Sequence, residues 1–305
     1  MNHGPLIFLG AFAALAFSWF GLIIEPQLQF GNAQPTNSIS PGDLYPQARS
    51  GQAQQGLQVY RSLGCATCHS QQAGQDGTVF DVVLAKAGTN QAEVVEALAR
   101  VKPGLSPAAV ARLILNVPSP ILEKVDKKTA DTAKEKLSVG GAQPEVVVVP
   151  TGPDIDRGWG KRRSVAADFL YDQPVMLGSQ RIGPDLANIG MRLPDAQWHL
   201  LHLYNPETAV KKSKMPPNRF LFEKRKIGRQ SSPDALKLTG EFASETGYET
   251  VPKDEAKALV AYLLSLRTGV VLFETPMTAP PAPAATNAPA VTNALSASIT
   301  NAAAK

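Results

Sequence analysis

The sequence predicts one membrane-spanning helix joined to a mainly α-helical head, with a small α/β domain inserted into that head. Three observations predict this organisation. An uncharged apolar run lies near the N-terminus, two amphipathic helical patterns stand far apart in the chain, and the stretch between them has strand and helix patterns of its own. A chain of 305 residues is long enough for more than one small domain.

The apolar run covers residues 6–24 and predicts a transmembrane helix. At about 1.5 Å per residue, it nearly spans a hydrocarbon core of about 30 Å. A cleaved signal peptide is the alternative, but such a peptide usually begins with basic residues, and the first Lys or Arg here is Arg49. We therefore expect an anchor at residues 1–27 and a polar linker, rich in Gly, Pro, Asn and Ser, at residues 28–50.

The charge of the chain indicates which partners it can bind, and its composition indicates which residues can fold. The formal net charge of +4 suits acidic partners or an anionic surface, and because it is not concentrated in long basic runs we expect no nucleic acid binding. After Thr275 the chain is almost entirely Ala, Pro, Thr, Asn and Ser, a composition that cannot bury enough apolar surface to fold. We expect a disordered tail at residues 271–305.

A stretch of different composition interrupts the head. Residues 79–150 contain no Trp, Tyr or His. Their periodicity predicts the order strand, helix, helix, helix, strand, at residues 80–84, 90–101, 106–115, 127–137 and 145–149. We interpret residues 79–150 as an inserted α/β domain that separates two parts of another domain, residues 51–78 and 151–270.

The two cysteines of the chain lie together in the sequence Cys-Ala-Thr-Cys-His, at Cys65, Cys68 and His69. This spacing lets each sulfur form a thioether with one haem vinyl group while the adjacent histidine binds the iron. A redox-active CxxC of the thioredoxin kind is the alternative, but it would follow a strand and give His69 no role. The motif therefore predicts one covalently bound haem c.

Two helical patterns frame this motif. Gly56 and Tyr60 are four residues apart and share a helix face before it. Residues 252–266 predict an amphipathic helix with Tyr262 in its apolar stripe and Pro252 suited to its start. In class I cytochromes c, an N-terminal helix with a glycine and an aromatic residue crosses a C-terminal helix. We expect the same crossing, and hence a mainly α class I cytochrome c head.

The second axial ligand of the iron must follow the motif, and a methionine is expected. The candidates are Met176, Met191, Met215 and Met277. Met215 precedes two prolines, which stiffen the loop that presents the sulfur, and it lies before the C-terminal helix. We predict that Met215 is the ligand, which would raise the reduction potential relative to two histidines and leave no open position on the iron.

Further candidate site residues lie between these methionines. Residues 181–186 resemble the loop that wraps the haem edge, so that Arg181 would pair with a propionate, and Gly183 and Pro184 would line the cofactor. His199 and His202 stand three residues apart on one predicted helix face. They could bind a metal as a pair, but we interpret them as packed or hydrogen-bonded helix residues.

Several segments of the head carry a family resemblance, namely residues 64–71, 166–174, 177–186, 198–206 and 215–216. With the anchor, they resemble the mono-haem subunit (subunit II) of cbb3-type cytochrome c oxidases. The chain departs from that family in the inserted domain after the motif and in the basic stretch at residues 157–164.

The inserted domain resembles an unrelated family, the C-terminal domain of the bacterial ribosomal stalk protein. The likeness lies in the order and spacing of residues 80–84, 87–90, 104–106, 117–118, 127–136 and 141–149. That family docks translation factors on a basic helical face, whereas the matching positions here are Gln91, Glu96, Ala108 and Ala111. The resemblance implies the fold without that binding, and a structural or docking role is our hypothesis.

The first resemblance implies an electron-transfer subunit of cytochrome c oxidase that relays single electrons from a donor cytochrome. The oxygen-reducing site would belong to a separate catalytic haem–copper subunit, and a further cytochrome c subunit would be a partner. Covalent haem attachment implies a single-pass protein of the bacterial inner membrane, anchored in its lipid, with the haem domain on the periplasmic side. One alternative is a free-standing membrane-anchored cytochrome c electron carrier, which would not need residues 166–186. Another is a haem-based gas sensor, which would have a labile Met215.

Overall fold

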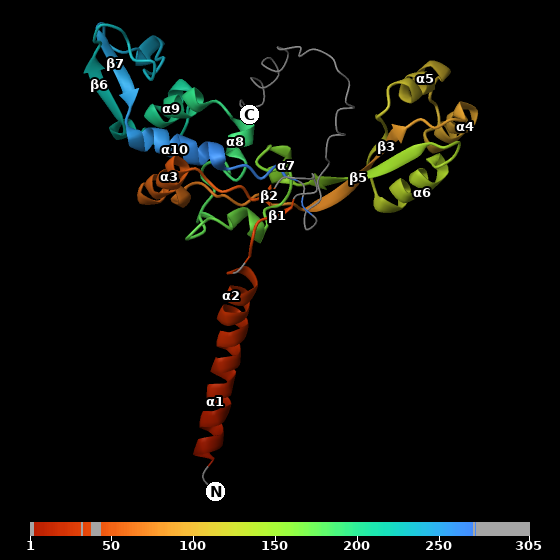
Figure 1. The fold of residues 1–305 in the computed structure, drawn as a ribbon, viewed down its shortest axis with the longest axis horizontal. Coiled ribbons are helices and arrows are strands. Elements are labelled where there is room, and N and C mark those ends of the chain that lie inside the picture. Colours follow the sequence, from red (N-terminus) through yellow and green to blue (C-terminus); the bar gives the residue numbers. More distant parts are fainter. Residues whose placement is uncertain (1–2, 32, 38–43, 271, 273–305) are drawn as a thin grey trace.

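The computed structural model describes residues 3–31, 33–37, 44–270 and 272. Figure 1 shows a long helix leaving the head, and a separate α/β domain at the far end of two long strands. The tail expected at residues 271–305 lies almost entirely outside the described residues, and Met277 lies outside them.

The N-terminal helix spans Gly4–Gln29, is 26 residues long and has a mean hydropathy of 2.3 over its most apolar window. It consists of α1 (Gly4–Trp19), a π-helical turn (Phe20–Ile24) and α2 (Glu25–Phe30). By length and composition it can cross a membrane. The helix continues beyond Pro26 because this proline stands in the first turn of α2, just after the π-helical turn, where a missing N–H is tolerated.

The second half of the expected linker is attached to the head. The short strands β1 (Thr36–Asn37) and β2 (Leu44–Tyr45) pair antiparallel. Tyr45 is buried, and its hydroxyl donates a hydrogen bond to Asp168 at 2.5 Å. Arg49 forms an ion pair with the buried carboxylate of Asp172, and its guanidinium lies 5.1 Å from the centroid of the Tyr262 ring. Within the predicted linker, buried polar contacts of Tyr45 and Arg49 therefore attach its last residues to the head.

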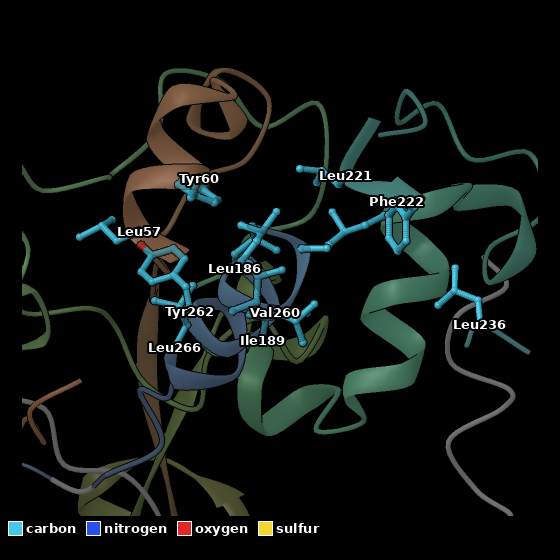
Figure 2. Close-up of a cluster of buried hydrophobic side chains, with 14 residues drawn as sticks. Leu57, Tyr60, Leu186, Ile189, Leu221, Phe222, Leu236, Val260, Tyr262 and Leu266 are labelled. Atoms are coloured by element: carbon cyan, nitrogen blue, oxygen red, sulfur yellow. The ribbon is translucent and has the colours of Figure 1, made fainter. Parts of the chain in front are cut away.

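The predicted crossing of an N-terminal and a C-terminal helix is present. Helix α3 (Gly51–Ser62) packs across α10 (Asp254–Ser265) at Gly56, where a Cβ would lie 1.9 Å from the Ala258 carbonyl oxygen. Only glycine allows this approach. The rings of Tyr60 and Tyr262 meet beside it with centroids 5.2 Å apart. Figure 2 shows these rings within a cluster of buried aliphatic side chains that forms the core of the head.

Short helices complete the head around this crossing. They are α7 (Pro153–Asp156), α8 (Ile189–Arg192), α9 (Ala196–Tyr204) and the 3₁₀ turns at Cys65–Thr67, Ala166–Phe169, Pro206–Thr208, Arg219–Leu221 and Gly240–Phe242. A hairpin of β6 (Phe222–Lys226) and β7 (Tyr248–Pro252) follows α9. The pattern at residues 252–266 predicted that Pro252 begins the last helix, which is wrong, since Pro252 ends β7 and Lys253 is the N-cap of α10.

The inserted domain is a three-stranded antiparallel sheet with three helices and a hydrophobic core of its own. Its elements are β3 (Gly77–Lys86), α4 (Gln91–Val101), α5 (Pro107–Leu115), β4 (Ser119–Val125), α6 (Lys127–Leu137) and β5 (Gln143–Thr151). The strand order is β4-β3-β5, and β3 pairs with β5 from Gly77 opposite Thr151 to Lys86 opposite Gln143. This long pair carries the domain away from the head (Figure 1).

The three predicted helices of this domain match closely, and the two predicted strands, at residues 80–84 and 145–149, are both longer than predicted. The order is wrong in one respect, because β4 was not predicted. Pro120 and three charged or polar residues hide its strand pattern. As an edge strand, β4 tolerates Pro120 because a missing backbone N–H removes no bond from the sheet interior.

Candidate haem-binding site

A helix leads directly into the Cys-Ala-Thr-Cys-His motif. Helix α3 ends at Ser62, and Gly64, with a φ of 67°, turns the chain in the left-handed region that favours glycine. A 3₁₀ turn follows at Cys65–Thr67, and the His69 N–H donates to the Cys65 carbonyl at 3.0 Å. The element before the motif is thus a helix and not the strand that the thioredoxin-like alternative requires.

The segment at residues 177–186 lies along the motif, although more than a hundred residues separate the two in sequence. Four backbone hydrogen bonds join them, from Gln71 N to Leu177 O at 2.9 Å, Ser179 N to Ala66 O at 2.9 Å, Gly183 N to Cys68 O at 2.9 Å and Leu186 N to Ser70 O at 2.8 Å. Two of the segments that carry the family resemblance therefore form one structural unit.

The imidazole of His69 is held in a defined tautomer. Its Nδ1 lies 2.8 Å from the Pro184 carbonyl oxygen. A carbonyl can only accept, so Nδ1 carries the proton and Nε2 keeps a free lone pair. Gly183 packs against the ring, since a Cβ at this position would lie 2.3 Å from His69 Cε1. The structure therefore brings together the three predicted residues His69, Gly183 and Pro184.

Both cysteines are free thiols and partly buried. Burial raises the pKa of the Cys65 thiol to about 11, with smaller opposing and supporting contributions from a backbone hydrogen bond and from Cys68. A protonated thiol at neutral pH is a poor nucleophile for disulfide exchange. This is a second observation against the thioredoxin-like alternative.

A buried carboxylate that the sequence pattern did not single out fixes the chain after His69. Asp185 is fully buried, and its Oδ2 accepts hydrogen bonds from Ser70 Oγ at 2.6 Å and Gln72 N at 2.8 Å. Its Oδ1 accepts from Ala187 N at 2.8 Å. Asp185 thus ties the loop after the histidine to the loop that carries Gly183.

Arg181 is engaged by protein groups on several sides. Its Nη1 donates to both oxygens of Asp154, at 3.0 and 2.9 Å, and its Nε donates to Ser70 Oγ at 2.8 Å. It also donates to the Gln72 carbonyl. Asp154 is buried at the junction with the inserted domain and accepts from Gly74 N at 2.7 Å. Arg181 therefore links α7, which directly follows the inserted domain, to the chain beside His69, and its contact with a propionate stays a prediction.

The methionines occupy different surroundings. Met215 and Met176 are both partly buried and pack against the hydrophobic core of the head, as Cys65 does. Met191 is 43% exposed, and a Cβ on Gly269 would lie 2.4 Å from its sulfur. Met215 therefore remains our predicted ligand, and Met176 is a second methionine on the same core.

The two histidines of α9 are packed, as the sequence suggested. His199 is buried with its Nε2 2.8 Å from the Leu193 carbonyl, and burial lowers its pKa. His202 stacks on Trp198 at 4.8 Å, and burial lowers its pKa to about 4, with the charges of His199 and His69 adding to the effect. The described residues hold no cluster of three or more metal-binding side chains.

Comparison with protein families finds two matches along the chain. Residues 148–261 match the family described as cytochrome C oxidase, mono-heme subunit/FixO. Residues 80–147 match the ribosomal protein L7/L12 C-terminal domain. Both resemblances drawn from the sequence are thereby confirmed. The second match begins within β3 and ends within β5.

The curated relatives named here are similar in sequence to the inserted domain. The large ribosomal subunit protein bL12 of Akkermansia muciniphila is 40% identical over 72 residues, which are 24% of this chain and 58% of that protein. The bL12 proteins of Burkholderia thailandensis and Saccharopolyspora erythraea are 45% and 42% identical, over 23% and 21% of this chain and 55% and 50% of their own lengths. The chain thus spans little more than half the length of the curated relatives it matches.

The residues at the site fit a covalent c-type haem. The motif supplies two free thiols, the Nε2 of His69 is the ring nitrogen not engaged by Pro184, and the core beside them contains two methionines. In addition, the buried Nδ1 of His202 has no hydrogen-bond partner among the described residues. Burying a nitrogen without a hydrogen-bond partner costs free energy. The Nδ1 of His202 is therefore placed to form a hydrogen bond with a polar group of a bound molecule.

Proposed function

We propose that this chain is the membrane-anchored mono-haem c-type cytochrome subunit of a cbb3-type terminal oxidase. In this role it relays single electrons from a donor cytochrome to the catalytic haem–copper subunit, which reduces oxygen. The main support is the unit formed by residues 64–71 and 177–186, in which His69 is oriented by Pro184 and packed by Gly183. The match of residues 148–261 to an oxidase mono-haem subunit supports the same assignment.

Each site residue then has a defined role. Cys65 and Cys68 would hold the haem through thioethers, and His69, through Nε2, and Met215 would bind its iron. The bound haem supplies one-electron redox chemistry at its iron. Pro184 orients the imidazole and raises its basicity by accepting from Nδ1. Because His69 and Met215 would both bind the iron, the chain would transfer electrons and would have no oxygen-reducing site of its own.

The anchor and the head together support a proposed location of the protein in the cell. The helix at Gly4–Gln29 would cross the bacterial inner membrane once, with the class I cytochrome c head on the periplasmic side, where covalent haem attachment takes place. The partners would be the catalytic haem–copper subunit and a further cytochrome c subunit. We also propose a structural or docking role for the inserted domain.

Purification from native membranes tests this proposal. The chain, tagged after residue 305, is isolated in mild detergent, and its partners are identified by visible spectroscopy and mass spectrometry. Co-purification of b-type haem, copper and a large multi-helix subunit, with oxygen consumption, is the expected result. Isolation of the chain alone with a c-type spectrum would instead support the free-standing membrane-anchored carrier.

The gas-sensor alternative makes a separate optical prediction. A sensor must open the iron to a gas, so carbon monoxide would shift the spectrum of the isolated ferrous chain. With Met215 held by the hydrophobic core, we expect no such shift. A full carbon monoxide shift at neutral pH would contradict closed histidine and methionine ligation.

A further inference from the structure

A group of basic side chains surrounds the segment that carries Met215. Between residues 208 and 222 the chain contains four cations and no Asp or Glu. A fifth cation, Lys253, joins them through a hydrogen bond from its Nζ to the Phe220 carbonyl at 2.9 Å. We call this surface the basic face, and it consists of Lys211, Lys212, Lys214, Arg219 and Lys253. The four cations of the segment alone equal the formal net charge of +4 of the whole chain.

The charges of the basic face are not neutralised within the protein. All five side chains are exposed, and none has an acidic partner among the described residues. The neighbouring hairpin is different, because Lys224 pairs with Glu245 at 2.6 Å and Arg225 pairs with Glu249 at 2.9 Å. Exposed cations without an acidic partner are available to an external anion, and here five of them are joined in one surface.

An exposed aromatic side chain stands within the basic face. Phe220 is 58% exposed, although its backbone is held by Lys253 and lies in the 3₁₀ turn at Arg219–Leu221. The turn is attached to the head, since Asn218 N donates to the Leu203 carbonyl at 2.8 Å. An apolar centre on a fixed backbone, surrounded by charge, is the composition of a protein interface.

The position of this face favours a protein over lipid as the partner. Its segment joins α9 to β6, and both elements lie on the side of the head away from α2 and the anchor (Figure 1). A membrane surface reached from the anchor would meet the opposite side of the head. The segment also contains Met215, so a molecule that docks here approaches the predicted ligand of the iron.

We infer that the basic face is the docking surface for an acidic surface of a protein that exchanges electrons with this chain. The inference rests on the proposed function, because the exchange requires the haem. Attraction between opposite charges accelerates the encounter and orients it, while Phe220 supplies the apolar contact. Such a complex is expected to weaken as ionic strength rises.

The first experiment measures binding without any redox step. A fluorescein-labelled poly-glutamate peptide is titrated with the full chain in detergent at low ionic strength. The variant Lys211→Gln/Lys212→Gln/Lys214→Gln is compared with Lys128→Gln/Lys134→Gln/Lys136→Gln, which removes the same charge from exposed positions of α6. We expect roughly ten-fold weaker binding for the first variant and little change for the second. Equal losses in both would show an effect of net charge and overturn the inference.

The second experiment measures electron transfer with small oxidants of opposite charge. The ferrous chain gives one electron to hexacyanoferrate(III), an anion, or to tris(phenanthroline)cobalt(III), a cation. In the triple variant at Lys211, Lys212 and Lys214 we expect about five-fold slower reaction with the anion and faster reaction with the cation. Unchanged rates would place electron exchange elsewhere and overturn the inference.

Two controls separate the possible failures. A chain without a c-type spectrum would refute the proposed function, whereas an intact spectrum with unchanged rates would refute only the docking surface. The reaction with hexacyanoferrate(III) is also measured in phosphatidylcholine vesicles with and without phosphatidylglycerol. If anionic lipid removes the difference between the wild type and the triple variant, lipid occupies the basic face, and the inference of a protein partner is wrong.

Discussion

Gly183 is the position at which the smallest substitution should perturb the haem site most. In the variant Gly183→Ala, the added Cβ would lie 2.3 Å from Cε1, 2.7 Å from Nδ1 and 2.9 Å from Nε2 of His69. Ordinary contact between such atoms requires about 3.5 Å, so the ring or the loop must move by roughly 1 Å. The backbone offers no relief, because two hydrogen bonds hold this loop to the motif on either side of the ring.

The expected cost follows from these contacts. Overpacking a tight site costs about 1–3 kcal/mol. If the loop moves instead, the bond from Gly183 N to Cys68 O and the bond between His69 and Pro184 weaken, at about 0.5–1.5 kcal/mol each. By either route we therefore expect the free energy of unfolding to fall by about 1–3 kcal/mol. Loss of the bond at Nδ1 also makes the imidazole a weaker donor to iron, which should raise the reduction potential.

Denaturant unfolding and a redox titration of the haem-loaded chain measure both effects. The control is Gly228→Ala, because a Cβ added at Gly228 would meet no atom within 4 Å and this glycine has no positive φ. The control should change the free energy of unfolding by less than about 0.5 kcal/mol. If Gly183→Ala has the stability and the reduction potential of the wild type, the close packing of Gly183 on His69 is refuted.

Three other substitutions test the frame around the site. The variant Gly56→Ala should separate α3 from α10, since the new Cβ meets the Ala258 carbonyl. In chemical denaturation we expect the free energy of unfolding to fall by at least about 2 kcal/mol. An unchanged free energy of unfolding would disprove the close crossing. Asp154→Asn should cost about 2 kcal/mol, because it weakens the contacts to Arg181 and Gly74, and unchanged unfolding midpoints would count against that link. Hydrogen bonds from Ser232 N and the Ser231 hydroxyl, then Arg225, lower the pKa of Glu249. The contribution of Glu249 to stability is thus present above its unfolded pKa and is lost as pH falls through its folded pKa. The variant Glu249→Gln should therefore flatten the acid side of a profile of stability against pH. An unaltered profile would contradict this reasoning.

Local patterns in the sequence determined much of the fold. Helices α4, α5, α6 and α10 were predicted within a few residues, and helices were expected without bounds where α3 and α9 lie, because apolar spacing and caps are local properties. The motif at Cys65, Cys68 and His69 indicated its chemistry from spacing alone. The inserted domain stood out because its composition differs from that of the head.

Elements whose stability comes from their neighbours were not predicted. Strand β4 contains Pro120 and is a strand because β3 lies beside it. Strand β6 presents four exposed charged side chains in a row and shows no alternation, yet it pairs with β7 along its whole length. In both cases the hydrogen-bonding partner lies far along the chain, and a local window does not contain it.

The sequence by itself singled out the residues that we propose bind the haem, because thioether formation and iron ligation depend on residue type and spacing. Only the tertiary structure decided how they are held, by bringing Pro184 to His69 and Asp185 to the loop after it. It also decided that Arg181 pairs with Asp154 and so connects α7, which follows the inserted domain, to the site. These contacts join residues separated by many tens of positions, and a buried carboxylate shows its role only when its donors surround it.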